Sequence, residues 1–407
     1  MNWLHSAAHA RWLEQESDEL LTFGAGAMVD DGFGFLDRSG QVELDRERPL
    51  WLTCRMIHSY SLGVLLGRPG AATMVDHGLT ALAHHSHDAE YGGWYAAVGP
   101  QTSEAKEAYA HAFVILAGAS ATAAGRPGAE KLLQQALEVS ERHFWREAEG
   151  MVVESWDREF TTLEDYRGVN ANMHTVEAYL TAADVTGEPV WLQRAARITA
   201  KVVGFAREHR WRIPEHFDAG WHPLLDYNAD QPAHPFRPAG ATVGHWLEWS
   251  RLVLQVRAAL RQRGMGTPEW MVPAARDLFH TAVREGWAVD GAEGFLYTVA
   301  FDGTPLVRAR MHWVLTEALA AAAALYRVEQ DPEVAGWYQT WWEYAANHLI
   351  DEERGSWLHE LDESNQPAAT VWGGKPDIYH ALQATLMPRL PLTPMFAPAL
   401  AAGLLDT

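Results

Sequence analysis

The sequence predicts an all-α protein, an (α/α)6 barrel in which six inner and six outer helices close into a ring. Two observations lead to this prediction. Amphipathic and strongly apolar helical segments alternate through the 407 residues. Glycine- and aromatic-rich loops recur at intervals of roughly 60 residues, with one longer interval, and such spacing indicates repeated supersecondary units. No long Pro-, Ser- or Gly-rich linker divides the chain, so we expect residues 1–407 to form a single domain.

The first helix of each repeat is amphipathic and is predicted to lie in the outer ring. Most of these helices begin near a proline or a glycine, which are common at helix starts. They are expected at 6–28, 70–85, 127–146, 189–209, 268–287 and 332–350. The second helix of each repeat is richer in apolar and small residues, as in FVILAGASATAA, and a helix that is apolar nearly all round is buried. These inner helices are expected at 49–66, 103–124, 169–185, 243–263, 307–328 and about 375–387.

The loops between the two helices of a repeat alternate apolar and polar residues around a turn, which predicts short β-hairpins. An open α-solenoid is the alternative architecture, and its terminal repeats would resemble caps. The last repeat, with the segment WGGKPDIYH, carries as many polar and aromatic groups as the middle repeats. We therefore expect a closed ring, with the hairpin loops at the mouth of the barrel.

Composition excludes several classes of function. The net charge of −21 argues against nucleic acid or an anionic membrane as a partner. A single cysteine, Cys54, excludes an internal disulfide and fits a reducing compartment. The N-terminus has no basic region followed by an apolar run, and the longest apolar stretches are too short to span a bilayer. These features predict a cytoplasmic protein.

Polar and aromatic side chains gather in the first turns of the predicted inner helices. Charged groups that face a barrel axis are costly unless they are paired or functional. Their concentration at one end of six helices predicts a ligand-binding or active-site funnel. The candidates are Trp51, Arg55, Tyr109, Asn170, Asn172, His174, Glu177, His245, Glu248, His312, Trp313, Glu317, Asp377 and His380. Trp372, beside glycines in a polar loop, suits the apolar face of a sugar ring.

A histidine and an acid recur three residues apart, on one face of a helix. The pairs are His174/Glu177, His245/Glu248 and Asp377/His380. A carboxylate beside a histidine can set its tautomer and basicity for proton transfer. A carboxylate-bridged di-metal centre is the alternative, but two of the pairs run opposite to its Glu-x-x-His order, and there is no HExxH string. Metal-free acid–base catalysis is therefore the preferred interpretation.

Seven segments carry a resemblance to a known family. They are WLTCRM (51–56), GGWYAAV (92–98), YRGVNANMHTVEA (166–178), EHFDAGWHPLLDYN (215–228), HPFRPAGATVGHWLEW (234–249), RARMHWVLTEA (308–318) and VWGGKPDIYH (371–380). Over nearly its full length the chain resembles the N-acylglucosamine 2-epimerase superfamily, and within it the aldose–ketose isomerases. The resemblance implies an (α/α)6 barrel, no metal or cofactor, and a free monosaccharide as substrate.

The resemblance also implies roles for particular residues. His245 and His380 match the two proton-transfer histidines, and the residues that bind and polarise the sugar are Arg55, His174, Arg237 and Glu248. The implied reaction is a 1,2-proton shift through a cis-enediol, in which Glu248 orients His245, while Arg55 and protonated His174 stabilise negative oxygens. Further sugar contacts are expected from Tyr109, Asn170, Trp313, Glu317, Trp372 and Asp377.

Substrate choice depends on two positions. The sulfosugar isomerases that the chain resembles have glutamines where this chain has His359 and Pro376, which favours interconversion of D-mannose and D-fructose over a sulfoquinovose isomerase. A sugar 2-epimerase is a further alternative. Two other classes stay open: a non-catalytic binding barrel, and an inverting glycoside hydrolase, which needs opposed carboxylates about 6.5–9.5 Å apart. The predicted mouth is richer in histidine than in opposed acids, which counts against hydrolysis.

Overall fold

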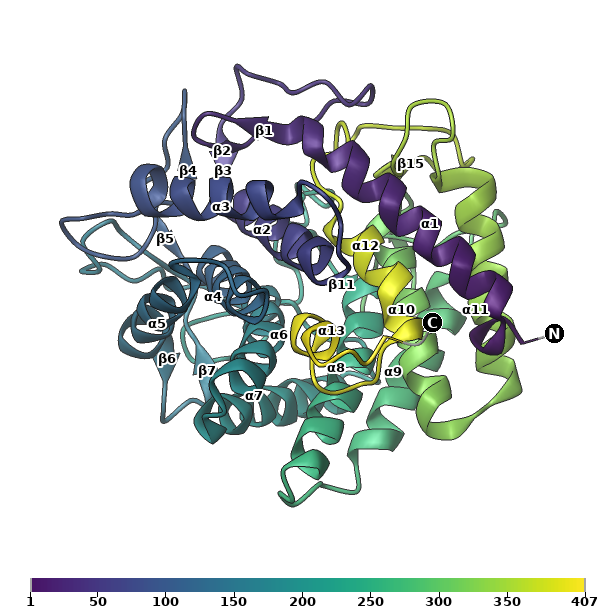
Figure 1. Cartoon of the computed structure of the whole chain (residues 1–407). Helices are drawn as coiled ribbons and strands as arrows, with labels where there is room; N and C mark the ends of the chain where they lie inside the picture. The colour runs from purple at the N-terminus through teal and green to yellow at the C-terminus, as the bar shows by residue number, and fades with distance from the viewer. Residues whose placement is uncertain (1, 406–407) are drawn as a thin grey trace.

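A computed structural model, which describes residues 2–405, confirms the double ring of helices (Figure 1). The inner helices are α2 (Leu50–Leu65), α4 (Ala108–Ala123), α6 (Val169–Thr186), α8 (Val243–Gln262), α10 (His312–Glu329) and α12 (Tyr379–Leu386). The outer helices are α1 (Ala7–Gly24), α3 (Ala71–Ala81), α5 (Ala129–Val139), α7 (Pro189–Glu208), α9 (Met271–Gly286) and α11 (Pro332–Tyr344). Because α1 packs against α12, the first and last repeats meet and the ring is closed.

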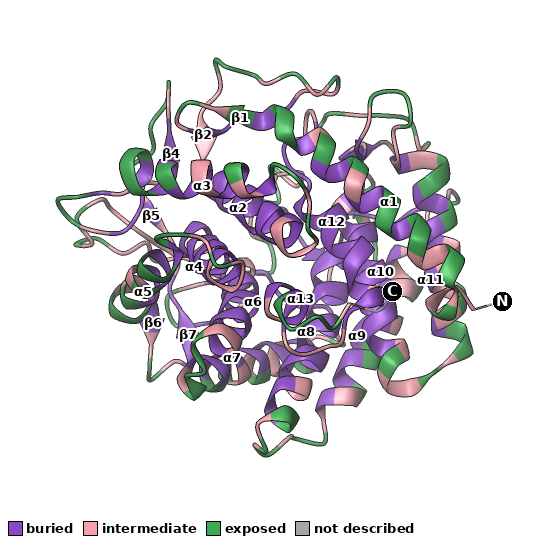
Figure 2. Cartoon of the chain, viewed as in Figure 1, coloured by how far each residue is buried: buried purple, intermediate pink, exposed green. Residues whose placement is uncertain are grey.

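Burial separates the two rings as the sequence pattern predicts. Nearly every residue of α4 is buried, whereas α5 buries only one face, made by Ala129, Leu132, Leu133, Ala136 and Leu137. Figure 2 shows the same contrast around the whole ring, with buried inner helices and exposed stripes on the outer ones. The polar groups of the inner helices are thus placed in a largely apolar core.

Most of the short strands link neighbouring repeats. A strand that precedes an inner helix pairs antiparallel with a strand from the next repeat. These pairs are β3 (Arg48–Pro49) with β4 (Ala97–Val98), β5 (Lys106–Glu107) with β8 (Ser155–Trp156), β9 (Arg167–Gly168) with β10 (His216–Phe217), β11 (Ala241–Thr242) with β12 (Thr298–Val299), and β14 (Arg310–Met311) with β15 (Glu360–Leu361). The backbone N–H of Lys375 donates to Leu36 O at 2.8 Å, which joins the last repeat to the first.

Three local hairpins accompany these links. They are β1 (Met28–Val29) with β2 (Gly32–Phe33), β6 (Trp145–Arg146) with β7 (Met151–Val152), and β12 with β13 (Pro305–Val307). The sequence therefore predicts the hairpin loops correctly. It does not predict that most strands pair between repeats, because such pairing depends on contacts made only when the ring closes.

Several helix boundaries differ from the sequence prediction. Helices α4, α10 and α12 begin at Ala108, His312 and Tyr379 rather than at 103, 307 and 375, because extended segments precede them. Three outer helices end in a π-helical turn: Leu82–Ser86, Ser140–Phe144 and Ala345–Leu349.

The sequence prediction also lacks one helix. The short helix α13 (Phe396–Ala401) packs against α2, α4 and α6 inside the ring (Figure 1). Just before it, Met395 N donates to the carboxylate of Asp184 at 2.8 Å, near the C-terminal end of α6. Helix α13 therefore lies at the C-terminal ends of the inner helices. Among residues 2–405, no helix is long and apolar enough to cross a membrane.

Candidate active site

A pocket opens at the N-terminal ends of the inner helices, and each inner helix supplies a side chain to it. These side chains are Arg55 from α2, Tyr109 from α4, His174 from α6, His245 from α8, Trp313 from α10 and His380 from α12. The predicted residues Asn170, Glu248, Trp372 and Asp377 line the same pocket. Its empty space, open mouth included, is about 660 Å³.

His245 is held by a carboxylate that the sequence does not single out. Its Nδ1 lies 2.9 Å from Glu215 Oε2, and both side chains are buried. Glu215 immediately precedes β10, and this strand carries it to the start of α8. The prediction that Glu248 orients His245 is wrong, because side chains from different repeats converge at the barrel axis and approach more closely than those three residues apart. With Nδ1 occupied, Nε2 of His245 is left for the pocket.

His380 has an equivalent partner from a neighbouring helix. Its Nδ1 lies 3.2 Å from Glu317 Oε1, and Arg251 donates to the other oxygen of Glu317 at 3.0 and 2.9 Å. Glu317 does not line the pocket but lies behind His380, so its predicted contact with the ligand is replaced by a contact with the histidine. The Trp313 ring lies 5.3 Å from His245 and 6.0 Å from His380 between ring centroids.

Burial keeps two of the site histidines neutral near neutral pH. Burial lowers the pKa of His380 well below its ordinary value, and Arg55 lowers it further. Burial also lowers the pKa of His174 to about 4, although the charge of Glu177 opposes the shift. The prediction of a protonated His174 is therefore wrong, because the cost of desolvating an imidazolium exceeds the attraction of the nearby carboxylates. A neutral His174 can still donate one hydrogen bond.

Arg55 supplies the fixed positive charge of the pocket. It donates to Asp377 Oδ2 at 3.1 Å and to the Tyr109 hydroxyl at 2.9 Å, and its guanidinium lies over the rings of Phe113 and Tyr379 at 4.6 and 4.9 Å. Burial acts to raise the pKa of Asp377, but Arg55 outweighs it and the pKa lies below its usual value. The acid three residues before His380 thus pairs with Arg55 rather than with that histidine.

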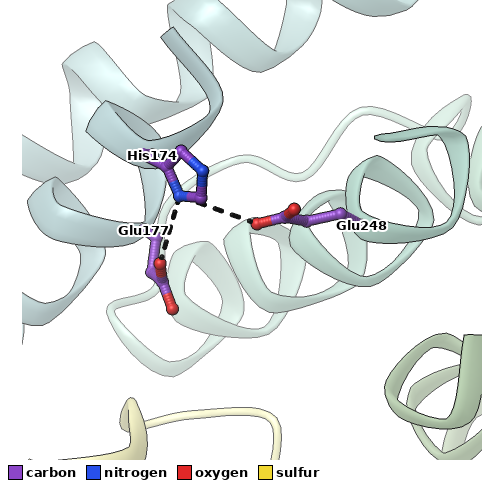
Figure 3. A group of neighbouring side chains, drawn as sticks. All are labelled: His174, Glu177 and Glu248. Atoms are coloured by element: carbon purple, nitrogen blue, oxygen red, sulfur yellow. Dashed lines mark ion pairs between the residues drawn. The ribbon is translucent and has the colours of Figure 1, made fainter. Parts of the chain in front are cut away.

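His174, Glu177 and Glu248 lie close together (Figure 3), and His174 and Glu248 line the pocket, whereas Glu177 lies behind them. His174 Nδ1 lies 3.7 Å from Glu177 Oε2 and 3.9 Å from Glu248 Oε1. Glu177 is fully buried, and it accepts hydrogen bonds from the Tyr379 hydroxyl and, at 2.9 Å, from Gln383. Burial and the charge of Glu317 raise the pKa of Glu248 well above its ordinary value, with Arg251 opposing.

Aromatic rings form one wall of the pocket. Trp51 and Trp372 meet edge to face at 6.2 Å, and Phe236 lies 6.0 Å from Trp51 and 5.2 Å from Trp372. Apolar ring faces at a mouth rich in hydrogen-bonding groups suit a sugar, whose C–H faces pack on aromatics. The sequence does not single out Phe236, although it lies in the quoted segment HPFRPAGATVGHWLEW.

Besides Glu177 and Glu317, two further predicted residues lie outside the lining of this pocket. Asn172 bonds to the backbone of Val152 and Gly168 and is structural. Arg237 pairs with Glu164 at 2.7 and 3.0 Å, stacks over Tyr166 at 3.9 Å, and lines a wider vestibule that adjoins the pocket at Trp51, Tyr109, Asn170 and Phe236. A direct contact between Arg237 and a ligand in the inner pocket is therefore not supported by its position.

Taken together, the fold and this lining define a closed helical barrel with a pocket lined by histidines and aromatic rings. The chain matches the model of the N-acylglucosamine 2-epimerase (GlcNAc 2-epimerase) family over residues 32–384, and it belongs to this family. The resemblance inferred from the sequence segments is thus confirmed.

Individual relatives are similar over nearly the whole chain. The chain is 49% identical over 405 residues to a D-mannose isomerase of Thermobifida fusca, covering 98% of each chain. It is 46% identical over 402 residues to a D-mannose isomerase of Pseudomonas cannabina pv. alisalensis, covering 98% of this chain and 97% of the relative. A crystal structure of a D-mannose isomerase has a TM-score of 0.86 at 29% identity, covering 93% of this chain and 97% of that one. A cellobiose 2-epimerase from Spirochaeta thermophila shares the fold, with a TM-score of 0.79 at 22% identity over 94% of this chain and 97% of that one.

Proposed function

We propose that the protein is an aldose–ketose isomerase that interconverts D-mannose and D-fructose by a 1,2-proton shift. The observation that carries the proposal is the pair His245 and His380. Each is held at Nδ1 by a buried carboxylate, both line one pocket, and both rings lie close to Trp313. The two relatives that share almost half of their residues with this chain are D-mannose isomerases, which supports this substrate pair.

In the proposed reaction, the ring-opened aldose binds with its first two carbons between the histidines. The hydrogen on the second carbon is acidic because the adjacent carbonyl accepts the electron pair left by its removal. His245 takes this proton at Nε2, which gives a cis-enediol, and returns it to the first carbon to give the ketose. Glu215 stabilises the imidazolium formed in between.

The remaining groups of the pocket act on oxygen atoms. Arg55 is cationic, and neutral His174 can donate a hydrogen bond, so both stabilise negative charge that develops on the enediol oxygens. His380, supported by Glu317, opens the sugar ring and moves protons between the oxygens. The aromatic wall of Trp51, Phe236 and Trp372 holds the sugar and excludes water from the reacting carbons.

Incubation of the purified protein with D-mannose in heavy water tests the proposal. We expect D-fructose to form, with deuterium on its first carbon where the transferred proton exchanges with solvent. Formation of D-glucose alone would identify a 2-epimerase, and binding without turnover would identify a binding barrel. Neither outcome is compatible with the proposed isomerase.

A second arm of this experiment addresses the di-metal alternative. We expect the activity to survive exhaustive treatment with a chelator, because the histidines and Arg55 supply proton transfer and charge stabilisation between them. Loss of activity that a divalent ion restores would contradict the metal-free mechanism.

A further inference from the structure

Three side chains beside the pocket bring donor atoms together at distances too long for hydrogen bonds and close to those between metal ligands. His174 Nδ1, Glu177 Oε2 and Glu248 Oε1 come from α6 and α8 and point toward one another (Figure 3). The distances of 3.7 and 3.9 Å from Nδ1 exceed the hydrogen-bond range. The three residues offer ligand atoms that all lie within 4.8 Å of one another. Two donors that share one Zn²⁺, each with a bond of about 2.0–2.2 Å, lie at most about 4.4 Å apart, so a small adjustment completes the site.

Two atoms in this cluster have no hydrogen bond. Within the described residues, neither His174 Nδ1 nor Glu248 Oε2 has a partner, although these side chains are only 5% and 1% exposed. Buried polar atoms nearly always have a partner, and each exception needs an explanation. His174 Nδ1 and Glu248 Oε2 are therefore both available to a ligand, whereas Glu248 Oε1 already accepts from Arg251.

The charge balance of the cluster also favours a cation. Glu177, Glu248 and Glu317 approach one buried cation, Arg251, which donates to Glu248 at 3.3 Å and to Glu317 at 2.9 Å. The neighbouring Arg55 is already paired with Asp377 at 3.1 Å. If all three carboxylates were ionised, they would exceed Arg251 by two negative charges; buried charges are costly unless compensated, and burial accordingly raises the pKa of Glu248 and of Glu317. A divalent ion supplies that compensation.

We propose that His174, Glu177 and Glu248 form a binding site for a divalent transition-metal ion of the Zn²⁺ type, and that the bound ion blocks the pocket. One imidazole and two carboxylates suit zinc and its neighbours, whereas Mg²⁺ and Ca²⁺ prefer all-oxygen sites. The ion is an inhibitor in this proposal, not a cofactor. The inhibition rests on the proposed function, because His174 and Glu248 cannot bind the sugar while they bind the ion. Binding of the ion does not depend on the proposed function.

Equilibrium dialysis of the whole chain against Zn²⁺ tests the site, with Mg²⁺ as the comparison ion. We expect the wild type to bind one more Zn²⁺ than Glu177→Gln or Glu248→Gln at low ion concentration, since each variant should weaken this site about tenfold or more. Glu317→Gln is the matched control: it removes the same charge beside Arg251 but no proposed ligand, and it should retain the ion. Equal binding by all four proteins, or equal loss in Glu317→Gln, would overturn the assignment.

A second measurement needs no variant and is therefore independent of folding defects. Anomalous diffraction at the zinc edge from soaked crystals should show an ion about 2.0–2.1 Å from His174 Nδ1. Zinc found only at exposed histidines would overturn the proposal. If the proposed isomerase activity holds, Zn²⁺ should also inhibit competitively with D-mannose; if that activity fails, dialysis and diffraction still decide whether the ion binds.

Discussion

Glu215 and Glu317 decide what His245 and His380 can do. Each carboxylate accepts from Nδ1, which fixes the tautomer and leaves Nε2 of both rings for the pocket. Glu317 in turn accepts hydrogen bonds from Arg251, so His380, Glu317 and Arg251 form one hydrogen-bonded chain. Because burial disfavours the charged imidazole of His380, this ring accepts a proton only in exchange with a partner that approaches closely.

The first prediction concerns His245. We expect His245→Ala to lose isomerase activity by about 10²–10⁴-fold, the range that a positioned acid–base group supplies. Affinity for a linear sugar alcohol should change far less, because the lost group acts mainly in the transition state. Calorimetric binding alongside steady-state kinetics measures both. A fully active variant would remove α8 from the proposed mechanism.

The second prediction treats Glu215 as a positioning residue. Glu215→Gln should lower kcat by less than the loss in His245→Ala and leave KM nearly unchanged, since it acts through the histidine. Asp218→Asn is the matched control: this exposed acid, in the same loop, bonds to the exposed His222 at 3.0 Å. It should retain wild-type kcat. A fall confined to KM in Glu215→Gln would show that Glu215 serves binding instead.

The third prediction concerns substrate choice. The His359 ring stacks on His312 at 3.7 Å between centroids, and burial lowers the pKa of His359 well below its ordinary value, so it offers no positive charge. Pro376 has no N–H. Burying a sulfonate without enough hydrogen-bond donors should cost at least ~1–3 kcal/mol of binding free energy. We therefore expect kcat/KM for sulfoquinovose to be about tenfold or more below that for D-mannose, whose hydroxyl needs only one partner. Turnover of sulfoquinovose equal to that of D-mannose would contradict this expectation.

At the scale of secondary structure, short strands and buried ion pairs set where the inner helices begin. Lys106 pairs with Asp88 at 3.0 Å, Arg310 with Asp290 at 2.7 Å, and Lys375 with Asp351 at 2.8 Å. Each cation shortly precedes an inner helix, and each acid lies in the loop that follows an outer helix. The first turn of the helix, which carries the site residue, is thereby tied to its own repeat as well as to the next.

This arrangement explains how far the sequence could be interpreted. Helical period and apolar content identify all twelve ring helices, because both are local properties, and twelve of the predicted site residues line one pocket. Glu215 was not predicted, because it reaches His245 across thirty residues and a strand pairing that forms only in the closed ring. The sequence does not predict helix α13, because six residues are too few to show a helical period. Its burial results from contacts with α2, α4 and α6, which form only in the closed barrel.

The fourth prediction tests the packing of α8 against α10. A Cβ added to Gly244 would lie 2.3 Å from Trp313 Cζ3, so Gly244→Ala must displace the tryptophan that neighbours both histidines. We expect the free energy of unfolding to fall by about 1–3 kcal/mol, together with a loss of kcat.

Gly204→Ala, near the C-terminal end of the outer helix α7, is the control for Gly244→Ala. A Cβ at Gly204 meets no atom within 4 Å, and alanine is favoured over glycine in a helix interior by roughly 0.5–1 kcal/mol. This variant should therefore be slightly more stable than the wild type and equally active. Denaturant unfolding and kinetics of the two variants check both statements. Equal stability of Gly244→Ala and wild type would show that α8 and α10 separate easily.

Across the whole molecule, closing the ring buries polar groups along the barrel axis. Glu177 bonds to Gln383, which contacts His58, and His58 in turn bonds to Ser120 at 2.7 Å. These residues come from four different inner helices, so their hydrogen bonds exist only in the assembled barrel. Such a network rigidifies a core when it is satisfied, and it makes the folded state sensitive to protonation.

The last prediction is that acid destabilises the fold between about pH 6.5 and pH 4. Burial lowers the pKa of His58 and of His174 to about 4, and that of His111 and of His312 to about 3, from the ordinary 6.5. The unfolded chain therefore binds protons at these histidines at a pH where the folded chain does not, and the free energy of unfolding falls as the pH falls. Glu154, whose pKa burial raises to about 7, contributes in the opposite sense, as do Glu248 and Glu317, whose pKa values burial also raises; the four histidines, together with His359 and His380, outnumber these carboxyls. Thermal unfolding in steps from pH 7.5 to pH 4.5 should show the decline.

His58→Gln should remove up to ~3 kcal/mol of this pH dependence, at ~1.4 kcal/mol per pKa unit, whereas His222→Gln, at an exposed site, should leave it unchanged. Stability that stays constant or rises down to pH 4.5 would contradict the prediction, since it would mean that the buried histidines gain protons without unfolding.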